Sequence, residues 1–374
     1  MRIALVHDYL VQYGGAERVL ENFTETWPDA PIFTLVHDSE KVHQKFKDKK
    51  IRTSFLQKSR IVKNHHRLFP PVMMAAMEQF HFDKYDVVLS DSSSFAKNII
   101  TSPETLHISY CHTPMRYAWD DCQYYIKEFS FPGLLKKTAP FFMNYIRVWD
   151  YFSTNGVDEF IANSNFVAGR IKKYYGRDST VINPPVDVDN FYVYNENKGG
   201  YLLAVGRMMK YKRMDLVIKA CNRLNQPLKI IGRGPEYKNL QKIAGPSVEF
   251  TGRVSDKQLR ELYAKAKAFI FPQEEDFGIV AIEALASGRP VVAYASGDIV
   301  ENIEDGKTGV LFWKQNEEEL AKAIKKLDKI KFDPNYIRST SLRFKKDIFQ
   351  KKIKKLVESK YQAHQNKLLK KAVA

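Results

Sequence analysis

Short apolar runs alternate with helix-length segments along nearly the whole chain, and this alternation limits the folds open to it. The runs hold β-branched residues, and segments such as 213–224, 235–244, 256–265 and 277–286 have apolar residues at helical spacing. Such alternation predicts parallel sheets covered by helices on both faces. We expect strands at 3–7, 32–36, 87–90, 107–110, 159–162 and 180–182, and again at 201–205, 228–231, 248–251, 268–271, 290–294 and 310–312.

A stretch rich in Pro, Gly and Asn, from Asn183 to Gly200, separates the two series of strands. About a dozen strands exceed the usual size of one twisted sheet. We therefore predict an α/β protein with two Rossmann-like parallel-sheet domains facing a central cleft, the first at 1–190 and the second at 191–349. The stretch from Arg338 onward is predicted to form helices without strands, and Ser255 is a candidate N-cap.

The net charge of +16 is concentrated in two stretches. Residues 41–67 hold ten Lys and Arg against one Asp, and residues 338–374 hold twelve against two acids. Such clustering indicates a polyanionic partner, which is a phosphorylated ligand, a nucleic acid or an anionic membrane; a solvated lysine-rich surface is the alternative. The apolar runs are too short to span a membrane, the start does not fit a secretory signal, and three cysteines without CxxC spacing suit a reducing compartment. We expect a cytoplasmic protein.

Glycines and cations follow the first strand of each series. Gly14-Gly15 would start a helix after the strand at 3–7 and offer N–H groups to an anion, although a merely structural turn is equally open. The pair does not form GxGxxG, so a dinucleotide-dependent enzyme is not supported. Gly206-Arg207, with Lys210, Lys212 and Arg213 close behind, follows the strand at 201–205, where cations would stabilise a diphosphate leaving group.

Two glutamates flank the predicted helix start at Phe277, Gly278 and Ile279. Glu275 and Glu283 would lie roughly 12 Å apart along a helix, too far for a glycosidase acid/base pair. The spacing suits two ends of an extended ligand whose phosphates face the helix start, although periodicity alone makes Glu283 a buried residue.

His112 follows the strand at 107–110 and is a candidate ligand contact or general acid/base, or a structural histidine. Nearby Tyr117 and Trp119 are expected to line a sugar. The Asp187-Val188-Asp189 triplet lies in the linker and is interpreted as structural, so no metal site is expected.

Taken together, these segments resemble glycosyltransferase family 4, whose members are retaining enzymes with the two-domain GT-B fold. The matching elements run in order along nearly the whole chain and include the family's E-x7-E element from Glu275 to Glu283. YCHTPMRYAWD and NPPVDVDNF are most similar to the bacterial mannosyltransferase subgroup that acts on O-antigen or exopolysaccharide precursors. The other matching segments are 14–18, 163–164, 185–187, 206–212 and 231–235.

The resemblance implies a role for each matching residue. Gly14 and Gly15 would meet the donor phosphates, and His112 would lie beside the transferred sugar or the acceptor. Gly206 with Arg207 and Lys212 would hold the diphosphate, Glu275 the sugar hydroxyls and Glu283 the ribose. Arg253, in the segment 251–254, would flank the base. The pattern departs from the family at Asp298, where a second glycine is usual.

The resemblance further implies transfer of a sugar, with mannose from GDP-mannose favoured and a UDP-sugar as the alternative, to a lipid-linked or polysaccharide-precursor acceptor. It implies no metal and no cofactor, and a last helix at about 350–374 that packs back on the first domain. A nucleic-acid-binding protein and a nucleotide-sugar epimerase are the competing classes, and the first is disfavoured because the basic stretches carry no binding motif.

A peripheral position on the inner face of the cytoplasmic membrane is also expected. Residues 41–67 combine their charge with Phe46, Phe55, Leu56 and Ile61, and the apolar run 68–74 follows at once. A basic face beside exposed apolar side chains suits binding to anionic lipid. The alternative is that these apolar residues pack inward.

Overall fold

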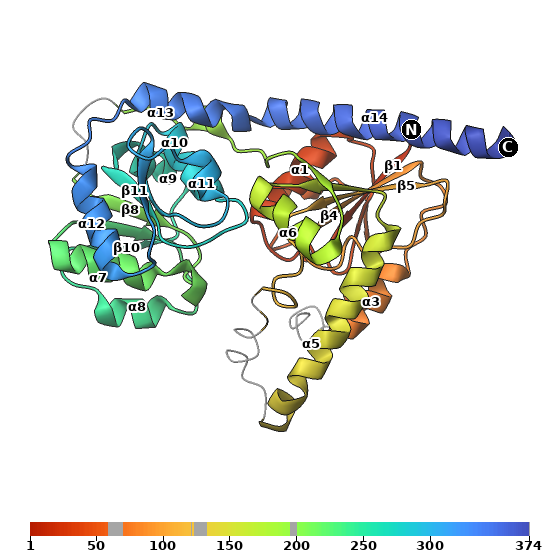
Figure 1. The fold of residues 1–374 in the computed structure, drawn as a ribbon, viewed down its shortest axis with the longest axis horizontal. Helices are drawn as coiled ribbons and strands as arrows, with labels where there is room; N and C mark the ends of the chain where they lie inside the picture. Colours follow the sequence, from red (N-terminus) through yellow and green to blue (C-terminus); the bar gives the residue numbers. More distant parts are fainter. Residues whose placement is uncertain (59–69, 121, 123–132, 195–199, 374) are drawn as a thin grey trace. The chain divides into compact units, whose positions relative to one another are not determined.

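The computed structural model describes residues 1–58, 70–120, 122, 133–194 and 200–373. The chain divides into two compact units, Met1–Pro184 with Phe349–Ala374, and Pro185–Ile348. The boundary expected after residue 190 therefore lies between Pro184 and Pro185, because the short helical turn at Val188–Asn190 already packs within the second unit. Each unit is a parallel sheet with helices against it, as predicted (Figure 1).

Unit 1 contains a seven-stranded sheet in the order β3-β2-β1-β4-β5-β6-β7. Chain order reverses between the neighbours β1 and β4, which makes that position the topological switch point of the sheet. The three-residue β3 was not predicted, since it is short and lies in the basic stretch. The strands are β1 (Ile3–His7), β2 (Ile32–Thr34), β3 (Ile51–Thr53), β4 (Val87–Ser92), β5 (Leu106–Cys111), β6 (Glu159–Ala162) and β7 (Ser179–Val181).

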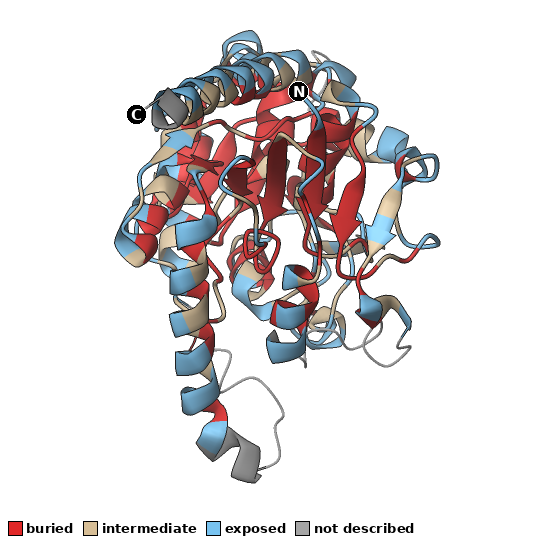
Figure 2. Cartoon of the chain, turned by 90° about the vertical axis from the view of Figure 1, so that its right-hand side faces the viewer, coloured by how far each residue is buried: buried red, intermediate tan, exposed pale blue. Residues whose placement is uncertain are grey.

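The central strands of unit 1 are buried along their whole length, because helices cover both faces of the sheet (Figure 2). This burial explains why the strand segments read as apolar runs rather than as alternating patterns. The helices and helical turns are α1 (Gly15–Thr26), η1 (Gln44–Phe46), η2 (Phe55–Lys58), α3 (Pro70–Glu78), α5 (Gly133–Ser153), η4 (Thr154–Gly156) and α6 (Asn165–Tyr175).

The last helix, α14 (Lys346–Val373), packs on unit 1 from Phe349 onward. Phe349, Ile353 and Val357 recur at helical spacing and are buried in the core that also holds Phe23. The rings of Phe23 and Phe349 stack with centroids 5.8 Å apart. The C-terminal helix thus returns to the first domain, as the resemblance implied.

Unit 2 contains a six-stranded sheet in the order β10-β9-β8-β11-β12-β13, with its switch point between β8 and β11. The strands are β8 (Leu202–Val205), β9 (Leu228–Ile231), β10 (Val248–Gly252), β11 (Ala268–Phe271), β12 (Val291–Tyr294) and β13 (Gly309–Phe312). All six match predicted strands to within one residue at either end.

The helices of unit 2 follow the predicted pattern. Ser255 caps α9, because its side chain accepts a hydrogen bond from the Gln258 N–H. No strand follows Arg338 up to residue 373, where the described part of the chain ends, as predicted. The helices and turns are η5 (Val188–Asn190), η6 (Lys210–Lys212), α7 (Met214–Leu224), α8 (Tyr237–Ile243), α9 (Asp256–Lys265), α10 (Ile279–Ala286), α11 (Ile299–Asn302), α12 (Glu317–Leu327), α13 (Pro334–Ser341) and η7 (Leu342–Phe344).

The prediction of an exposed basic and apolar face at 41–74 is wrong for most of the apolar residues that the structure describes there. Phe46 and Leu56 are buried in two separate cores of unit 1, and Met73 and Met74 are buried in the second of these. Phe55 and Val72 stay exposed, while Ile61, Leu68 and Phe69 lie outside the described residues. The residues pack inward because η1, η2 and α3 each supply an apolar side to the sheet.

None of the helices in the described ranges is long and apolar enough to cross a membrane.

Candidate functional site

Three side chains meet at the switch point of the unit 1 sheet, at the carboxyl ends of β1, β4 and β5. His7 and Asp91 are direct partners in the register of β1 and β4, and His7 Nδ1 lies 2.8 Å from Asp91 Oδ2. His112 Nε2 lies 2.5 Å from Asp91 Oδ1. His7 and Asp91 are buried, whereas the His112 side chain is 13% exposed. Asp91 therefore bridges a buried histidine and a partly exposed one.

The groups of this cluster shift the pKa values of His7 and Asp91 in favour of their charged forms. Burial alone lowers the pKa of His7, but hydrogen bonds and charge interactions with Asp91 and Glu17 outweigh it and raise the pKa to about 10. Burial alone raises the pKa of Asp91, yet His112 and His7 outweigh it and the pKa is lowered. At neutral pH the pair is an imidazolium and a carboxylate.

The position of His112 is held on several sides. Its N–H donates to the Ser92 carbonyl at 2.8 Å, and Asn163 Nδ2 donates to the His112 carbonyl at 2.8 Å. Tyr110 meets the imidazole edge-on, with ring centroids 5.2 Å apart. With Nε2 directed at Asp91, Nδ1 has no partner within the described part of the chain and is not buried. His112 thus presents one defined nitrogen to a ligand.

The Gly14-Gly15 turn belongs to the same cluster. Gly14 is the N-cap of α1, and its N–H donates to Glu17 Oε2 at 2.8 Å, while Glu17 Oε1 lies 3.9 Å from His7 Nε2. The expected free N–H at Gly14 is therefore occupied by a buried carboxylate, and Gly15 remains exposed. Glu17, His7 and Asp91 link two predicted site elements, the glycine turn and His112.

The stability of the chain should fall between about pH 8 and 9 because of His7. Its pKa is near 10 when folded and 6.5 ordinarily, so this contribution is complete below 6.5 and is lost as the pH rises toward 10. Burial raises the pKa of Asp298 to about 8, so this group lowers stability with rising pH only below pH 8. Burial also raises the pKa of Cys221 from its ordinary 9.0, so this group lowers stability only above pH 9.0. Urea denaturation should show a loss of about 1 kcal/mol over this interval. A His7→Gln variant should lack it, and an equal loss in both proteins would contradict the assignment.

Tyr117 and Trp119, which were expected to line a sugar, are half-buried in unit 1. Trp119 Nε1 donates to Asp150 Oδ2 at 2.8 Å, and Lys97 Nζ lies 2.5 Å from Asp150 Oδ1 in the same buried cluster. Burial raises the pKa of Tyr117 well above its usual range. These contacts fix both aromatic residues within unit 1, and their place beside a sugar stays a prediction.

In unit 2, Lys212 and Glu275 form an ion pair at the switch point between β8 and β11. Lys212 ends η6 after β8, and Glu275 lies in the loop after β11, so the parallel arrangement brings their loops to one edge. Gln273 Nε2 donates to Glu275 Oε1 at 3.3 Å. The two side chains are only 13% and 14% exposed. The structure thus brings these two predicted site residues together, and their roles stay predictions.

Glycines allow the loops after β8, β9 and β10 to lie against each other. Gly206 N–H donates to the Ile231 carbonyl at 3.0 Å, and Gly232 N–H donates to the Gly252 carbonyl at 2.9 Å. A Cβ on Gly232, which has φ +136°, would lie 2.0 Å from the Gly206 carbonyl oxygen. No other residue fits there without moving the backbone.

An arginine follows the glycine at each of these three strand ends. Arg207, Arg233 and Arg253 are exposed, and none has a side-chain partner within the described residues. Arg207 and Arg253 were predicted, whereas Arg233 was not assigned a role, although the Gly-Arg dipeptide at three consecutive strand ends was a usable signal. Three adjacent cations at a carboxyl edge form an anion-binding surface.

Two backbone N–H groups at the start of α10 form hydrogen bonds with other groups of the protein. Gly278 N–H donates to Asp298 Oδ2 at 3.3 Å, and Ile279 N–H donates to the Phe277 carbonyl at 3.2 Å. The Phe277 ring packs on Phe344. These N–H groups are thus not open to a phosphate as expected. Asp298, the residue that departs from the family pattern, accepts the Gly278 bond with a carboxyl group that is mostly uncharged at neutral pH, because burial raises its pKa to about 8.

Glu283 is buried on α10, as the alternative interpretation expected. Its Oε2 accepts a hydrogen bond from the Tyr263 hydroxyl at 3.2 Å, and that hydroxyl also lies 3.0 Å from the Val280 carbonyl. The ribose-binding role that the resemblance implied stays a prediction.

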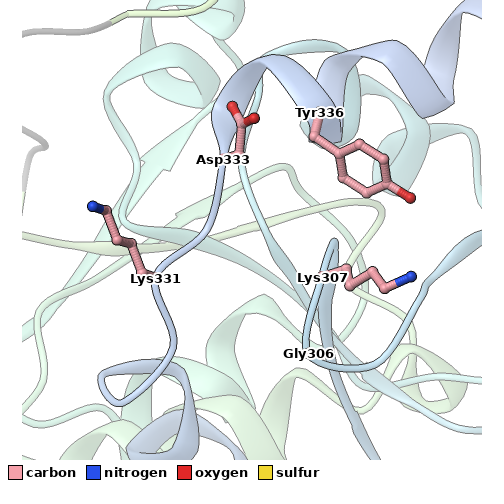
Figure 3. A pocket seen from close by; sticks show the side chains of 5 residues that line it. All are labelled: Gly306, Lys307, Lys331, Asp333 and Tyr336. Atoms are coloured by element: carbon pink, nitrogen blue, oxygen red, sulfur yellow. The ribbon is translucent and has the colours of Figure 1, made fainter.

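A pocket of about 350 Å³ in unit 2 lies away from these residues (Figure 3). It is lined by Gly306, Lys307, Lys331, Asp333 and Tyr336. Gly306 and Lys307 precede β13, so the pocket lies at the amino end of that strand and not at the carboxyl edge. It is not a candidate for the donor site.

Asp187 and Asp189 are exposed at the start of unit 2, whereas Val188 between them is buried. Lys345 Nζ lies 2.7 Å from Asp189 Oδ1. Among the described residues, no group of three or more His, Cys, Asp and Glu is placed to hold a metal ion.

Comparison with known proteins matches both halves of the chain to glycosyltransferase families. The family described as Glycosyltransferase Family 4 matches residues 13–190, and the family described as Glycosyl transferases group 1 matches residues 199–329. An uncharacterized glycosyltransferase of Methanocaldococcus jannaschii, MJ1178, is 28% identical over 181 residues, which are 47% of this chain and 51% of that protein.

Two further proteins extend the comparison. A GDP-mannose-dependent alpha-(1-6)-phosphatidylinositol monomannoside mannosyltransferase of Mycolicibacterium smegmatis is 28% identical over 188 residues, covering 42% of this chain and 49% of that protein. The structure of Anabaena Alr3699/HepE in complex with UDP aligns with a TM-score of 0.71 and 18% identity, covering 96% of this chain and all of that one. The alignments span about half the length of these curated relatives. With both families matched in order and the fold shared, the chain belongs to the glycosyltransferases of the GT-B fold.

Proposed function

We propose that the protein transfers a sugar from a nucleoside-diphosphate sugar to an acceptor hydroxyl. The observation that carries the proposal is the cationic edge of unit 2, where Arg207 and Lys212 follow β8 and Lys212 pairs with Glu275 at a topological switch point. This edge offers cations for a diphosphate and a carboxylate for sugar hydroxyls.

In the proposed reaction the bond between the anomeric carbon and the diphosphate oxygen breaks, and its electrons leave with the nucleoside diphosphate. The acceptor oxygen forms the new bond to the same carbon, and its proton passes to an oxygen of the departing diphosphate. Arg207 and Lys212 would stabilise the charge that develops on the leaving group. Glu275 would exchange its contact with Lys212 for sugar hydroxyls, and Arg233 and Arg253 would face the rest of the nucleotide. The configuration at the anomeric carbon would be retained, as the family resemblance implies.

His112 is proposed to hold the transferred sugar or the acceptor through Nδ1. Asp91 fixes the ring through Nε2, and the protonated His7 keeps Asp91 ionised. His7 and Asp91 are therefore positioning residues for His112.

Mannose from GDP-mannose is the proposed donor, and a lipid-linked or polysaccharide-precursor saccharide is the proposed acceptor. The relative named for GDP-mannose and for a phosphatidylinositol mannoside supports both choices. A UDP-sugar is the alternative donor, which the UDP complex of the structural neighbour favours. We place the enzyme on the cytoplasmic face of an anionic membrane, where such an acceptor would be reached.

Thermal denaturation with GDP, UDP and their sugars, each with and without EDTA, tests the proposal. A donor at 100 times its dissociation constant should stabilise the folded protein by about 2.7 kcal/mol. EDTA should not change the shift, since Asp189 is paired with Lys345 and is not assigned to a metal. The guanine series should shift more than the uracil series. No shift with any nucleotide would contradict the donor site, and a shift that needs manganese would contradict metal independence.

A further inference from the structure

Helix α5 of unit 1 presents an apolar face to solvent. Phe141, Tyr145, Val148 and Phe152 follow one another at spacings of four, three and four residues, and their exposed fractions are 78%, 57%, 47% and 62%. Such spacing places the four side chains on one stripe of the helix. In Figure 2 the helix that runs down from the sheet, α5, is pale blue along much of its length.

The opposite side of α5 anchors it to unit 1. Ala139, Ile146 and Asp150 are buried, and Ile146 lies in the core that contains Met73 and Met77 of α3. Trp149 Nε1 donates to Glu78 Oε1 at 3.3 Å. Because the opposite side of α5 packs against unit 1, the exposed stripe is the outward face of a fixed helix.

The exposed face also has no charged residue. Between 138 and 152 the exposed positions are aromatic, aliphatic or uncharged polar, and the charged Arg147 and Asp150 are half-buried and buried. Surface helices normally place charged residues outward, and contiguous apolar patches mark interaction sites. The exposed positions are Thr138, Pro140, Phe141, Phe142, Asn144, Tyr145, Val148, Tyr151 and Phe152.

We infer that this face of α5, defined by Phe141, Phe142, Tyr145, Val148 and Phe152, docks in the interfacial layer of an anionic membrane. The inference deepens the proposed function, on which it rests, by naming the element that brings the enzyme to a lipid-linked acceptor. It replaces the predicted face at 41–74, most of whose described apolar residues are buried.

Charge favours a lipid surface over a second copy of the chain. The protein has a net charge of +16. A second copy would bring the same positive charge, whereas anionic headgroups attract it. From Phe141 to Phe152 the helix rises roughly 16 Å, which suits a helix lying along the interface and not across a core of about 30 Å. Phenylalanine and tyrosine side chains are suited to that layer.

Vesicle co-sedimentation tests the inference with the full chain. The wild type should bind phosphatidylglycerol-containing vesicles, bind phosphatidylcholine vesicles weakly, and dissociate as salt rises from about 0.05 to 0.5 M. The triple variant Phe141→Ser, Phe142→Ser, Phe152→Ser should lose roughly tenfold or more of the binding, because three exposed apolar side chains are removed. Its melting temperature should be unchanged, since all three are exposed.

The matched control is Ile100→Ser with Leu369→Ser, which removes two exposed apolar side chains of unit 1, 65% and 64% exposed, outside α5. The control should bind like the wild type. Equal loss in both variants, or unchanged binding of the triple variant, would overturn the inference. A wild-type dimer that the triple variant abolishes would instead identify a second copy as the occupant and overturn it too. Donor turnover in solution is measured beside this assay, so that failure of the proposed function is seen separately.

Discussion

Replacing Arg207 with alanine should lower kcat by roughly 30- to 1000-fold and leave the melting temperature unchanged. The loss corresponds to about 2–4 kcal/mol of transition-state stabilisation, the usual effect of removing one group that faces a developing charge. Arg207 is exposed and has no partner among the described residues, so its removal should not weaken the fold. Steady-state kinetics with saturating donor measures the effect.

Arg223→Ala is the matched control for this variant. Arg223 is an exposed arginine in the last turn of α7, which runs back from the carboxyl edge of the sheet. The control should keep the wild-type kcat. Adding Lys212→Ala to Arg207→Ala should lower kcat further, because Lys212 is the second cation proposed to stabilise the leaving group. A double variant with near-normal turnover would show that neither residue acts on the leaving group.

Replacing Asp91 with asparagine should lower kcat on the order of 100-fold with little change in KM for the donor. Asparagine keeps the size of the side chain but removes the charge that fixes His112 Nε2 and pairs with His7. Correctly placed proton donors and acceptors contribute about 10²–10⁴-fold to turnover. Because Asp91 is the main partner that raises the pKa of His7, that pKa should fall in the variant, and the pH dependence of kcat should shift with it.

His107→Gln supplies a control for disturbing a buried histidine of the same sheet. Burial lowers the pKa of His107 to about 4, and its ring is bonded to Ser90 Oγ at 2.9 Å and Gly156 O at 3.0 Å. For His107→Gln we expect a loss of stability without a shift in the pH dependence of kcat. If Asp91→Asn shows only that behaviour, Asp91 is a structural residue and the positioning role is wrong.

The strands and the main cationic edge could be predicted because both depend on local patterns. Buried parallel strands are apolar along their length, and Arg207, Lys212 and Glu275 follow such strands directly. Parallel sheets bring their carboxyl ends to one edge, so the pairing of Lys212 with Glu275 follows once β8 and β11 are neighbours.

The His7–Asp91–His112 cluster was not predicted, since it depends on strand order. His7 and Asp91 are 84 residues apart and meet only because β1 and β4 are neighbours. In the sequence Asp91 is one polar residue in a serine-rich run, and nothing local marks it as a partner of a histidine.

The exposed face of α5 and the buried residues at 41–74 show the same limit. An apolar residue at helical spacing predicts a helix with an apolar side, but not what packs against it. Phe46 meets a core, whereas Phe141 meets solvent, and only the tertiary arrangement separates the two.

The most direct test of the account is to follow a donor by proton NMR in the presence of the enzyme and an octyl glycoside acceptor. With GDP-mannose, or with a UDP-sugar as the alternative, we predict that nucleoside diphosphate and glycosylated acceptor form in equal amounts in the presence of EDTA. The new glycosidic bond should have the anomeric configuration of the donor. Intact donor in every reaction, or a product of inverted configuration, would contradict the proposed function.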